Sequence, residues 1–117
     1  MSDITRIDAG PRMSGAVFHG NTVYVSGQVA LDAGGQSVTV QTQSVLGRID
    51  ALLAKAGTDK TKLLSASIWL SDIATFEEFN GVWDAWVVAG ATPARATVEA
   101  KLAAPQFTVE IAVIAAT

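Results

Sequence analysis

Two charged residues, Arg95 and Glu110, stand in segments that otherwise read as β-strands. Arg95 lies in TPARATVEA (residues 92–100), and Glu110 follows fifteen residues later in FTVEIAV (residues 107–113). An arginine guanidinium presents a planar fork that binds a carboxylate through two hydrogen bonds, and it keeps its charge at any working pH. A glutamate can accept or deliver a proton when its pKa lies near the working pH. The pair therefore suits a site that anchors a small carboxylate and moves a proton beside it.

Three further residues could contribute to such a site. Ser26 and Gly27 end a strand-like run, where a hydroxyl or a backbone N–H can bind a ligand and a glycine allows close approach to the backbone. Asn80 lies inside a helical pattern that its low helix propensity disfavours, which indicates a capping or orienting role.

Each charged residue also has a purely structural interpretation. Arg95 can pair with Glu99 or with an acid of a neighbouring subunit, and Glu110 can be an ion-pair partner on a sheet face. Lys101 reads as a solvated or interface charge. Residue types and spacing leave both interpretations open.

The composition restricts the classes of function. A chain of 117 residues indicates one domain, residues 1–117. Half of the residues are hydrophobic, which is enough for a core. The net charge of −3 supplies no basic surface for a phosphate backbone, so we expect no nucleic-acid partner. No apolar run approaches the roughly 20 residues needed to cross a bilayer, so we expect no membrane partner.

The sequence offers little for thiol or metal chemistry. It contains no cysteine, which excludes disulfides, thiolate nucleophiles and cysteine metal sites. The single histidine, His19, precedes a Gly-Asn turn signal and reads as a loop or strand-end residue, whereas metal sites usually need several imidazoles or thiolates. We therefore expect no metal site. The start of the chain lacks a signal-peptide pattern, and we expect a cytoplasmic protein.

Hydrophobic periodicity predicts six strands and two helices. Alternating patterns predict strands at residues 3–8, 15–18, 22–27, 62–72, 94–102 and 107–115. Apolar residues spaced by three and four predict one helix from about residue 38 to 56, ended by Gly57, and a second over roughly 74–89, ended by Gly90. The order strand–strand–strand–helix–strand–helix–strand–strand predicts a two-layer α+β fold with both helices on one face of a mixed sheet.

The opposite face of this sheet is too apolar to remain in water. The alternation places Tyr24, Trp69, Ala112 and Ile114 on it. Because extended apolar patches usually mark interfaces, we expect another subunit to cover this face.

We also expect the last two strands to form a hairpin around residues 103–106. In the register that pairs Leu102 with Phe107, Arg95 and Glu110 share one face but stand about four residues apart, on the order of 13 Å. A small ligand held by both would need a second chain or a distorted register. This register therefore predicts a site between subunits.

Taken together, these residues resemble the reactive intermediate deaminase family, the Rid or YjgF-type proteins. The family's C-terminal signature is similar to PARATVEAKLAAPQFTVEIAVIAA at residues 93–116, and SGQ (26–28) and TFEEFNGVWDAW (75–86) fit as well. The run WDAWVVAG (83–90) resembles the shorter, YoaB-like branch. The resemblance covers essentially the whole chain.

The resemblance implies a chorismate-mutase-like fold and a homotrimer with a cleft at each subunit interface. It also implies hydrolysis of 2-imino acids, or of their enamine tautomers, to 2-oxo acids and ammonia without a cofactor or metal. By position, the catalytic residues would be Arg95, which anchors the carboxylate, and Glu110, which handles water and protons.

The substrate-binding residues that the resemblance implies include two departures from the family pattern. The matching positions are Ser26, Gly27 and Asn80. Thr97 stands where archetypal members have a cysteine, and Met13 stands where an aromatic residue, typically tyrosine, lines the cleft. The second change removes a hydroxyl and leaves Arg12 as an unmatched cation beside the site, which bears on substrate choice.

Three other functions remain open from the sequence. A non-catalytic trimer that binds small carboxylates, as a metabolite sensor or regulator, needs Arg95 but not Glu110. Chorismate-mutase-type chemistry needs several cations around a dicarboxylate, and the chain has only four arginines. RNA cleavage, which has been claimed for relatives, conflicts with the net charge of −3.

Overall fold

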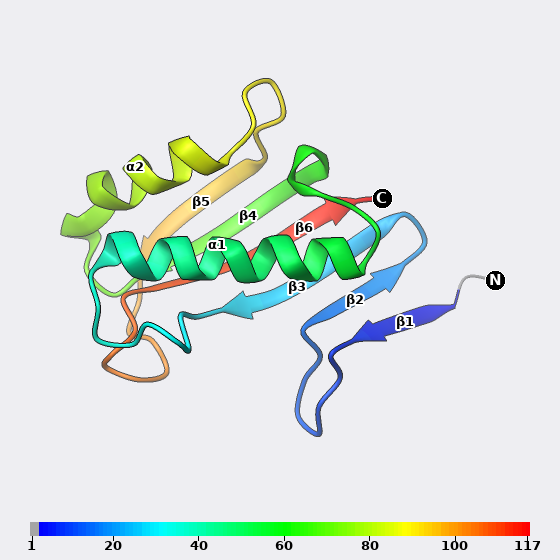
Figure 1. Cartoon of the computed structure of the whole chain (residues 1–117), viewed down its shortest axis with the longest axis horizontal. Helices are drawn as coiled ribbons and strands as arrows, with labels where there is room; N and C mark the ends of the chain where they lie inside the picture. The colour runs from blue at the N-terminus through cyan, green and yellow to red at the C-terminus, as the bar shows by residue number, and fades with distance from the viewer. Residues whose placement is uncertain (1–2) are drawn as a thin grey trace.

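A computed structural model describes residues 3–117 as a six-stranded mixed sheet with two α-helices (Figure 1). The strands are β1 (Ile4–Ile7), β2 (Ala16–His19), β3 (Thr22–Gln28), β4 (Leu63–Leu70), β5 (Ala94–Glu99) and β6 (Val109–Ala116). The α-helices are α1 (Val38–Lys55) and α2 (Phe76–Trp86), and short 3₁₀ turns cover Lys60–Lys62 and Ile73–Thr75. The predicted element order and the α+β class are confirmed.

Both helices lie on one face of the sheet, as Figure 1 shows, and the molecule is only 20 Å deep along its shortest axis. The strand order is β1-β2-β3-β6-β4-β5. Strands β4 and β5 run parallel, and the other neighbouring strands run antiparallel. This is the two-layer arrangement that the periodicity predicted.

Alternation along the strands builds the core between the sheet and the helices. In β6 the residues Val109, Ile111, Val113 and Ala115 are buried, and the intervening residues are half-buried on the opposite face. The helical layer contributes the fully buried Val45, Leu46, Ile49, Leu53 and Phe79. The spacing of these apolar residues is what holds each helix to the sheet.

The ends of α1 follow its local sequence. The Ser37 hydroxyl accepts a hydrogen bond from the backbone N–H of Val40, which caps the first turn. At the other end Gly57 has a positive φ of 78°. Its N–H donates to the Ala54 carbonyl and the N–H of Thr58 donates to the Leu53 carbonyl, which together form a Schellman motif. The predicted stop at Gly57 is confirmed.

Two local predictions were wrong. Helix α2 ends at Trp86 and not near residue 89, because Val87 turns to an extended conformation with ψ of 148°. The alternation within residues 62–72 places Leu64 on one face with Ala66, Ile68 and Leu70, but in β4 Leu64 is half-exposed and Leu63 is buried in its place, because the register with β6 slips between Leu63 and Ser65.

The predicted hairpin between the last two strands does not form. Strand β4 lies between β5 and β6, so β5 pairs with β4 and has no ladder with β6. The fully buried Gln41 of α1 anchors the connecting segment: its Nε2 donates to the Gln106 carbonyl at 2.8 Å, and its Oε1 accepts from the N–H of Thr108 at 2.9 Å. The connection is therefore a tethered loop that passes β4 rather than a tight turn.

The sheet face away from the helices carries the apolar residues predicted for it. Tyr24 pairs with Ile114, and Trp69 pairs with Glu110 and Val98. Tyr24 and Val98 are each about half-exposed. Nothing in the described part of the chain covers this surface, which we call the open face (Figure 1). In residues 3–117 we also find no helix with the length and apolarity that a bilayer crossing requires.

Candidate functional site

Helix α2 holds the Arg95 side chain. Arg95 Nη1 donates a hydrogen bond to Asn80 Oδ1 at 3.0 Å. The guanidinium carbon lies 5.6, 5.8 and 5.4 Å from the ring centroids of Phe76, Phe79 and Trp83, within cation–π range. Asn80 therefore orients the arginine, as its unfavourable helical position suggested, and an aromatic surface supports the cation.

Arg95 is not paired with Glu99. The Glu99 Oε1 atom accepts a hydrogen bond from the N–H of Ile73 at 3.1 Å, which holds the 3₁₀ turn before α2. Within residues 3–117 no carboxylate lies within 4 Å of Arg95, and the residue is exposed. The guanidinium donors beyond the bond to Asn80 can therefore receive an external anion.

Thr97 lies two residues after Arg95 on the same face of β5. Its hydroxyl is buried and has no hydrogen-bond partner within residues 3–117. A buried unpaired hydroxyl is uncommon because its desolvation goes uncompensated. Thr97 therefore offers a free hydroxyl on the same face of β5 as Arg95.

A β-bulge brings Glu110 to the end of β3. Val25 pairs with Val113 and Gln28 pairs with Ile111, so β3 has one extra residue at Ser26–Gly27. A Cβ atom placed on Gly27 would lie 2.1 Å from Glu110 Oε2. The carboxylate thus occupies the space that a side chain at position 27 would fill, and it lies directly against the Gly27 backbone.

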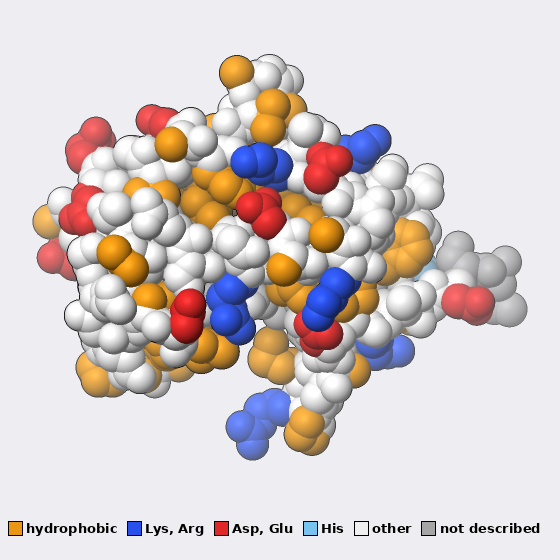
Figure 2. Space-filling view, viewed as in Figure 1, with side chains coloured by type: hydrophobic (Ala, Val, Ile, Leu, Met, Phe, Trp, Pro, Cys, Tyr) orange, Lys and Arg blue, Asp and Glu red, His pale blue; other side chains and the backbone are white. Residues whose placement is uncertain are grey.

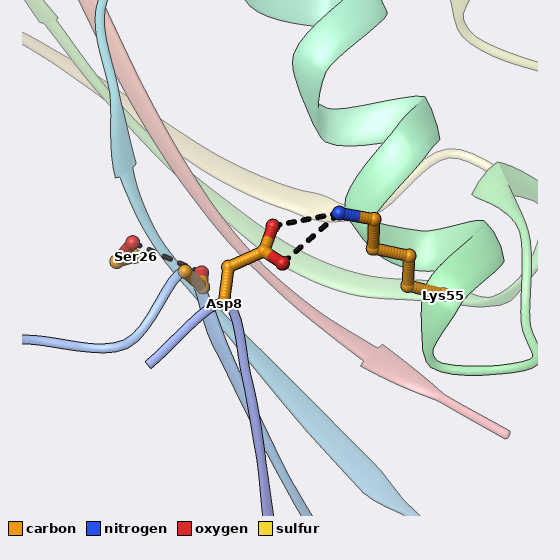
Figure 3. A network of polar contacts seen from close by, with 4 residues as sticks. Asp8, Ser26 and Lys55 are labelled. Atoms are coloured by element: carbon orange, nitrogen blue, oxygen red, sulfur yellow. Dashed lines mark hydrogen bonds and ion pairs between the residues drawn. The ribbon is translucent and has the colours of Figure 1, made fainter. Parts of the chain in front are cut away.

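The Ser26 side chain serves the structure of the bulge. Its N–H and its Oγ–H both donate to the Gly15 carbonyl at 2.9 Å (Figure 3), and its Oγ accepts from Gln28 Nε2 at 3.1 Å. Both donors of Ser26 are therefore used within the chain. They fix the loop of residues 8–15, in which Asp8 has a positive φ of 51°, against the end of β3.

Met13 and the bulge share a cleft of about 540 Å³ between the 8–15 loop and α1. Met13 is half-exposed and lines this cleft with Ser26 and Gly27. From α1 the cleft is lined by Arg48 and Lys55, two residues that the sequence reading did not single out. Their seven-residue spacing, next to the core positions Ile49 and Leu52, is a signal that would have placed them together on one face.

The prediction that Arg95 and Glu110 share a face was wrong. Arg95 pairs with the buried Ala66 and turns toward α2, whereas Glu110 alternates with buried Val109 and Ile111 and points to the open face. Arg95 and Glu110 are also offset by three positions, about 10 Å, along the strands and by two interstrand spacings of about 4.8 Å. Within one chain a small ligand cannot contact both.

The predicted residues therefore form two groups. The first, which we call the arginine group, is Asn80, Arg95 and Thr97 beside α2. The second, which we call the bulge group, is Met13, Ser26, Gly27 and Glu110 at the end of β3. Within residues 3–117 no cluster of three or more His, Cys, Asp or Glu side chains could hold a metal ion. The available chemistry is anion binding by the arginine group and acid–base chemistry by the bulge group.

Comparison with known proteins defines the class. The family model described as Endoribonuclease L-PSP matches residues 4–117. The RutC family protein YoaB of Escherichia coli is 46% identical over 114 residues, which cover 97% of each chain. A RutC family protein of Haemophilus influenzae is 46% identical over 96% of this chain and 97% of the relative.

Solved structures agree with this class. The structure of NMB1025 from Neisseria meningitidis, a member of the YjgF protein family, superposes with a TM-score of 0.95 at 46% identity, covering 98% of this chain and 95% of that one. The chain therefore belongs to the Endoribonuclease L-PSP family of YjgF-type, or Rid, proteins, and it is similar to the YoaB-like branch.

Proposed function

We propose that this protein hydrolyses reactive 2-imino acids, or their enamine tautomers, to 2-oxo acids and ammonia at a site between subunits of a homotrimer. The observation that carries the proposal is the state of Arg95. The guanidinium is oriented by Asn80 and three aromatic rings, yet no carboxylate in residues 3–117 neutralises it. An exposed, preorganised guanidinium of this kind suits a ligand carboxylate.

Assembly explains how the two groups would meet. The arginine group lies at the β5 edge of the sheet, and the bulge group lies beyond β6 at the end of β3. In the proposed trimer the open faces bury one another, and the β5 edge of one copy approaches the bulge of the next. Each cleft then receives Arg95 from one chain and Glu110 from its neighbour.

The chemistry needs few groups. Arg95 binds the carboxylate of the imino acid, and the backbone at Gly27 fixes the reacting end. Glu110 orients a water molecule that adds to the carbon of the C2=N bond. Glu110 accepts a proton from this water as the water adds and passes it to the nitrogen, so that ammonia leaves; the hydroxyl on C2 gives up its proton to Glu110 as the C2=O bond forms. Because such imines also hydrolyse unaided, positioning and one proton relay, about 10²–10⁴-fold, are sufficient.

The non-catalytic carboxylate-binding trimer is the alternative, and Met13 favours it. Met13 places a thioether in the cleft where the family pattern has a hydroxyl-bearing ring, so the cleft offers one polar group less. Nucleic-acid cleavage, to which the family description refers, has less support here. The net charge is −3, and Figure 2 shows acidic and basic side chains interspersed on the helix-bearing face without a basic stripe.

The test is a competition between hydrolysis and trapping. D-Alanine and an amino-acid oxidase generate 2-iminopropanoate, semicarbazide traps it, and the rate of adduct formation is followed. We expect the wild type to suppress the adduct. Arg95→Ala and Glu110→Gln should each lower kcat/KM by about tenfold or more, because one loses the carboxylate anchor and the other loses the proton relay.

Two exposed residues provide matched controls. Lys62→Ala and Glu77→Gln make the same changes in charge outside both groups, and each should retain the wild-type rate. A wild type that behaves like buffer but still binds 2-oxobutanoate through Arg95 would establish the non-catalytic alternative.

A further inference from the structure

The cleft beside the bulge group contains a cation that the proposed mechanism does not use. Arg48 of α1 lines the cleft together with Met13, Gly27 and Leu31. In Figure 2 the surface is hollowed between the projecting 8–15 loop, at the bottom of the view, and the body of the molecule. The cleft is therefore open to a ligand from outside.

Arg48 lacks a partner among the described residues. Its Nε atom is buried without a hydrogen bond, and no carboxylate of residues 3–117 lies within 4 Å of its guanidinium. A buried charged donor without an acceptor is destabilising, so an incoming acceptor gains more here than at a solvated surface arginine.

The other charges of the cleft are already paired. Lys55 Nζ contacts both carboxylate oxygens of Asp8, at 2.9 and 3.0 Å, as Figure 3 shows. Asp32 lies near Arg48 but outside the cleft lining, and its carboxylate accepts a hydrogen bond from Ser44. That bond, with a smaller contribution from the Arg48 charge, lowers the pKa of Asp32. Among the charged residues that line the cleft, Lys55 and Asp8 pair with each other, and Arg48 is the cation that remains without an ion-pair partner.

We propose that Arg48 binds a second carboxylate of the substrate, so that the preferred substrates are imino acids whose side chain ends in a carboxylate. The assignment rests on the proposed function, in which the reacting carbon lies at Gly27, which lines this cleft, and at the Glu110 carboxylate, which lies against Gly27 outside the lining. Arg95 of the neighbouring copy takes the carboxylate next to the imine, and Arg48 takes the distal one. The apolar side chains of Met13 and Leu31 suit the carbon chain between them.

The reaction is a hydrolysis without a redox step. For 2-iminosuccinate, water adds across C2=N, the nitrogen takes up protons and leaves as ammonium, and C2 becomes the carbonyl carbon of oxaloacetate. The imine must come from a reaction that oxidises, or eliminates from, an acidic amino acid. A matching amino-acid oxidase acting on aspartate supplies it in the assay.

The experiment compares two imines in the trapping assay, 2-iminosuccinate from aspartate and 2-iminopropanoate from alanine. We expect the wild type to show the higher kcat/KM with 2-iminosuccinate. Arg48→Gln should lower the ratio of the two kcat/KM values by roughly tenfold or more, because one charge-assisted hydrogen-bonded pair is lost. Lys62→Gln removes one positive charge at an exposed residue of the Lys60–Lys62 turn, outside the cleft lining, and should leave the ratio as it is. An unchanged ratio in Arg48→Gln would overturn the assignment.

A binding measurement separates this inference from the proposed function. Calorimetry compares oxaloacetate and 2-oxoglutarate with 2-oxobutanoate, using wild type and Arg48→Gln of confirmed oligomeric mass. If the diacids bind more tightly than 2-oxobutanoate and this difference depends on Arg48, the inference is supported. If neither imine is hydrolysed in that case, only the proposed hydrolase activity is rejected. Equal binding of mono- and diacids by the wild type would reject the role of Arg48, whatever the activity.

Discussion

At Gly27 the absence of a side chain gives the Glu110 carboxylate its place. The bulge aligns the Gly27 backbone with Glu110 Oε2, and Ser26 fixes the bulge through the Gly15 carbonyl. A side chain at position 27 would therefore displace the Glu110 carboxylate and would leave the core packing unchanged.

We expect Gly27→Ala to remove most of the activity while the protein stays folded. The new Cβ would lie 2.1 Å from Glu110 Oε2 and 3.0 Å from Glu110 Cδ, so the carboxylate must move, which a flexible side-chain end can do at small cost. Since a small displacement of a catalytic group lowers the rate strongly, kcat/KM should fall by about tenfold or more, with little change in the melting temperature. Kinetics and a thermal melt check this. Full activity in Gly27→Ala would remove Glu110 from the proposed mechanism.

The arginine group illustrates what residue types alone can and cannot tell. A strand arginine and a mid-helix asparagine were each identified as unusual from the sequence, and the structure joins them in one hydrogen bond. The pairing of Arg95 with Glu99 was an equally open alternative on the sequence. It fails because Glu99 is already bonded to the N–H of Ile73, a long-range contact without a local signal.

At the scale of elements, α1 carries a glycine that its geometry does not need. Gly47 lies inside the helix, and a Cβ there would meet nothing within 4 Å. Replacing glycine with alanine reduces the backbone entropy lost on folding. Gly47→Ala should therefore raise the free energy of unfolding by about 0.5–1 kcal/mol, measured by chemical denaturation at fixed protein concentration.

Gly57→Ala is the matched comparison in the same helix. Gly57 has φ of 78° in the Schellman motif, a conformation that alanine adopts only with strain. This variant should lower the stability by about 1 kcal/mol, opposite in sign to Gly47→Ala. If both variants changed the free energy of unfolding by the same amount and in the same direction, the backbone conformation at the two glycines would not explain the change.

Elements were predictable where periodicity and end signals act locally, and less so where pairing is long-range. The apolar spacing of α1 and the turn at Gly57 are both readable in sequence. The strand that pairs with β5 could not be predicted from the sequence, because the short connection between the last two strands favours a hairpin. It is Gln41, a polar residue at a core-facing position of α1, that tethers the connection and lets β4 lie between β5 and β6.

At the scale of the whole molecule, the separation of the two groups and the apolar open face support the same assembly. One chain holds Arg95 against α2, whereas Glu110 lies on the open face together with Tyr24, Trp69 and Ile114. An intersubunit site was inferred from sequence through a strand register that proved wrong. The observed register gives the same inference for a different reason, since the two groups point away from each other.

Tyr24→Lys tests this assembly and the site together. Tyr24 is 49% exposed in the single chain, so a lysine there leaves the folded chain undisturbed, but it would bury an unpaired charge if another copy covers the open face. We expect the mass in solution to fall from about three chains toward one, and the imine-hydrolysing activity to fall with it, because neither group suffices alone. Val40→Lys, at a residue 37% exposed on α1, is the control and should keep both mass and activity. Circular dichroism verifies that each variant is folded. A folded, monomeric Tyr24→Lys protein that retains wild-type activity would show that one chain completes the site by itself.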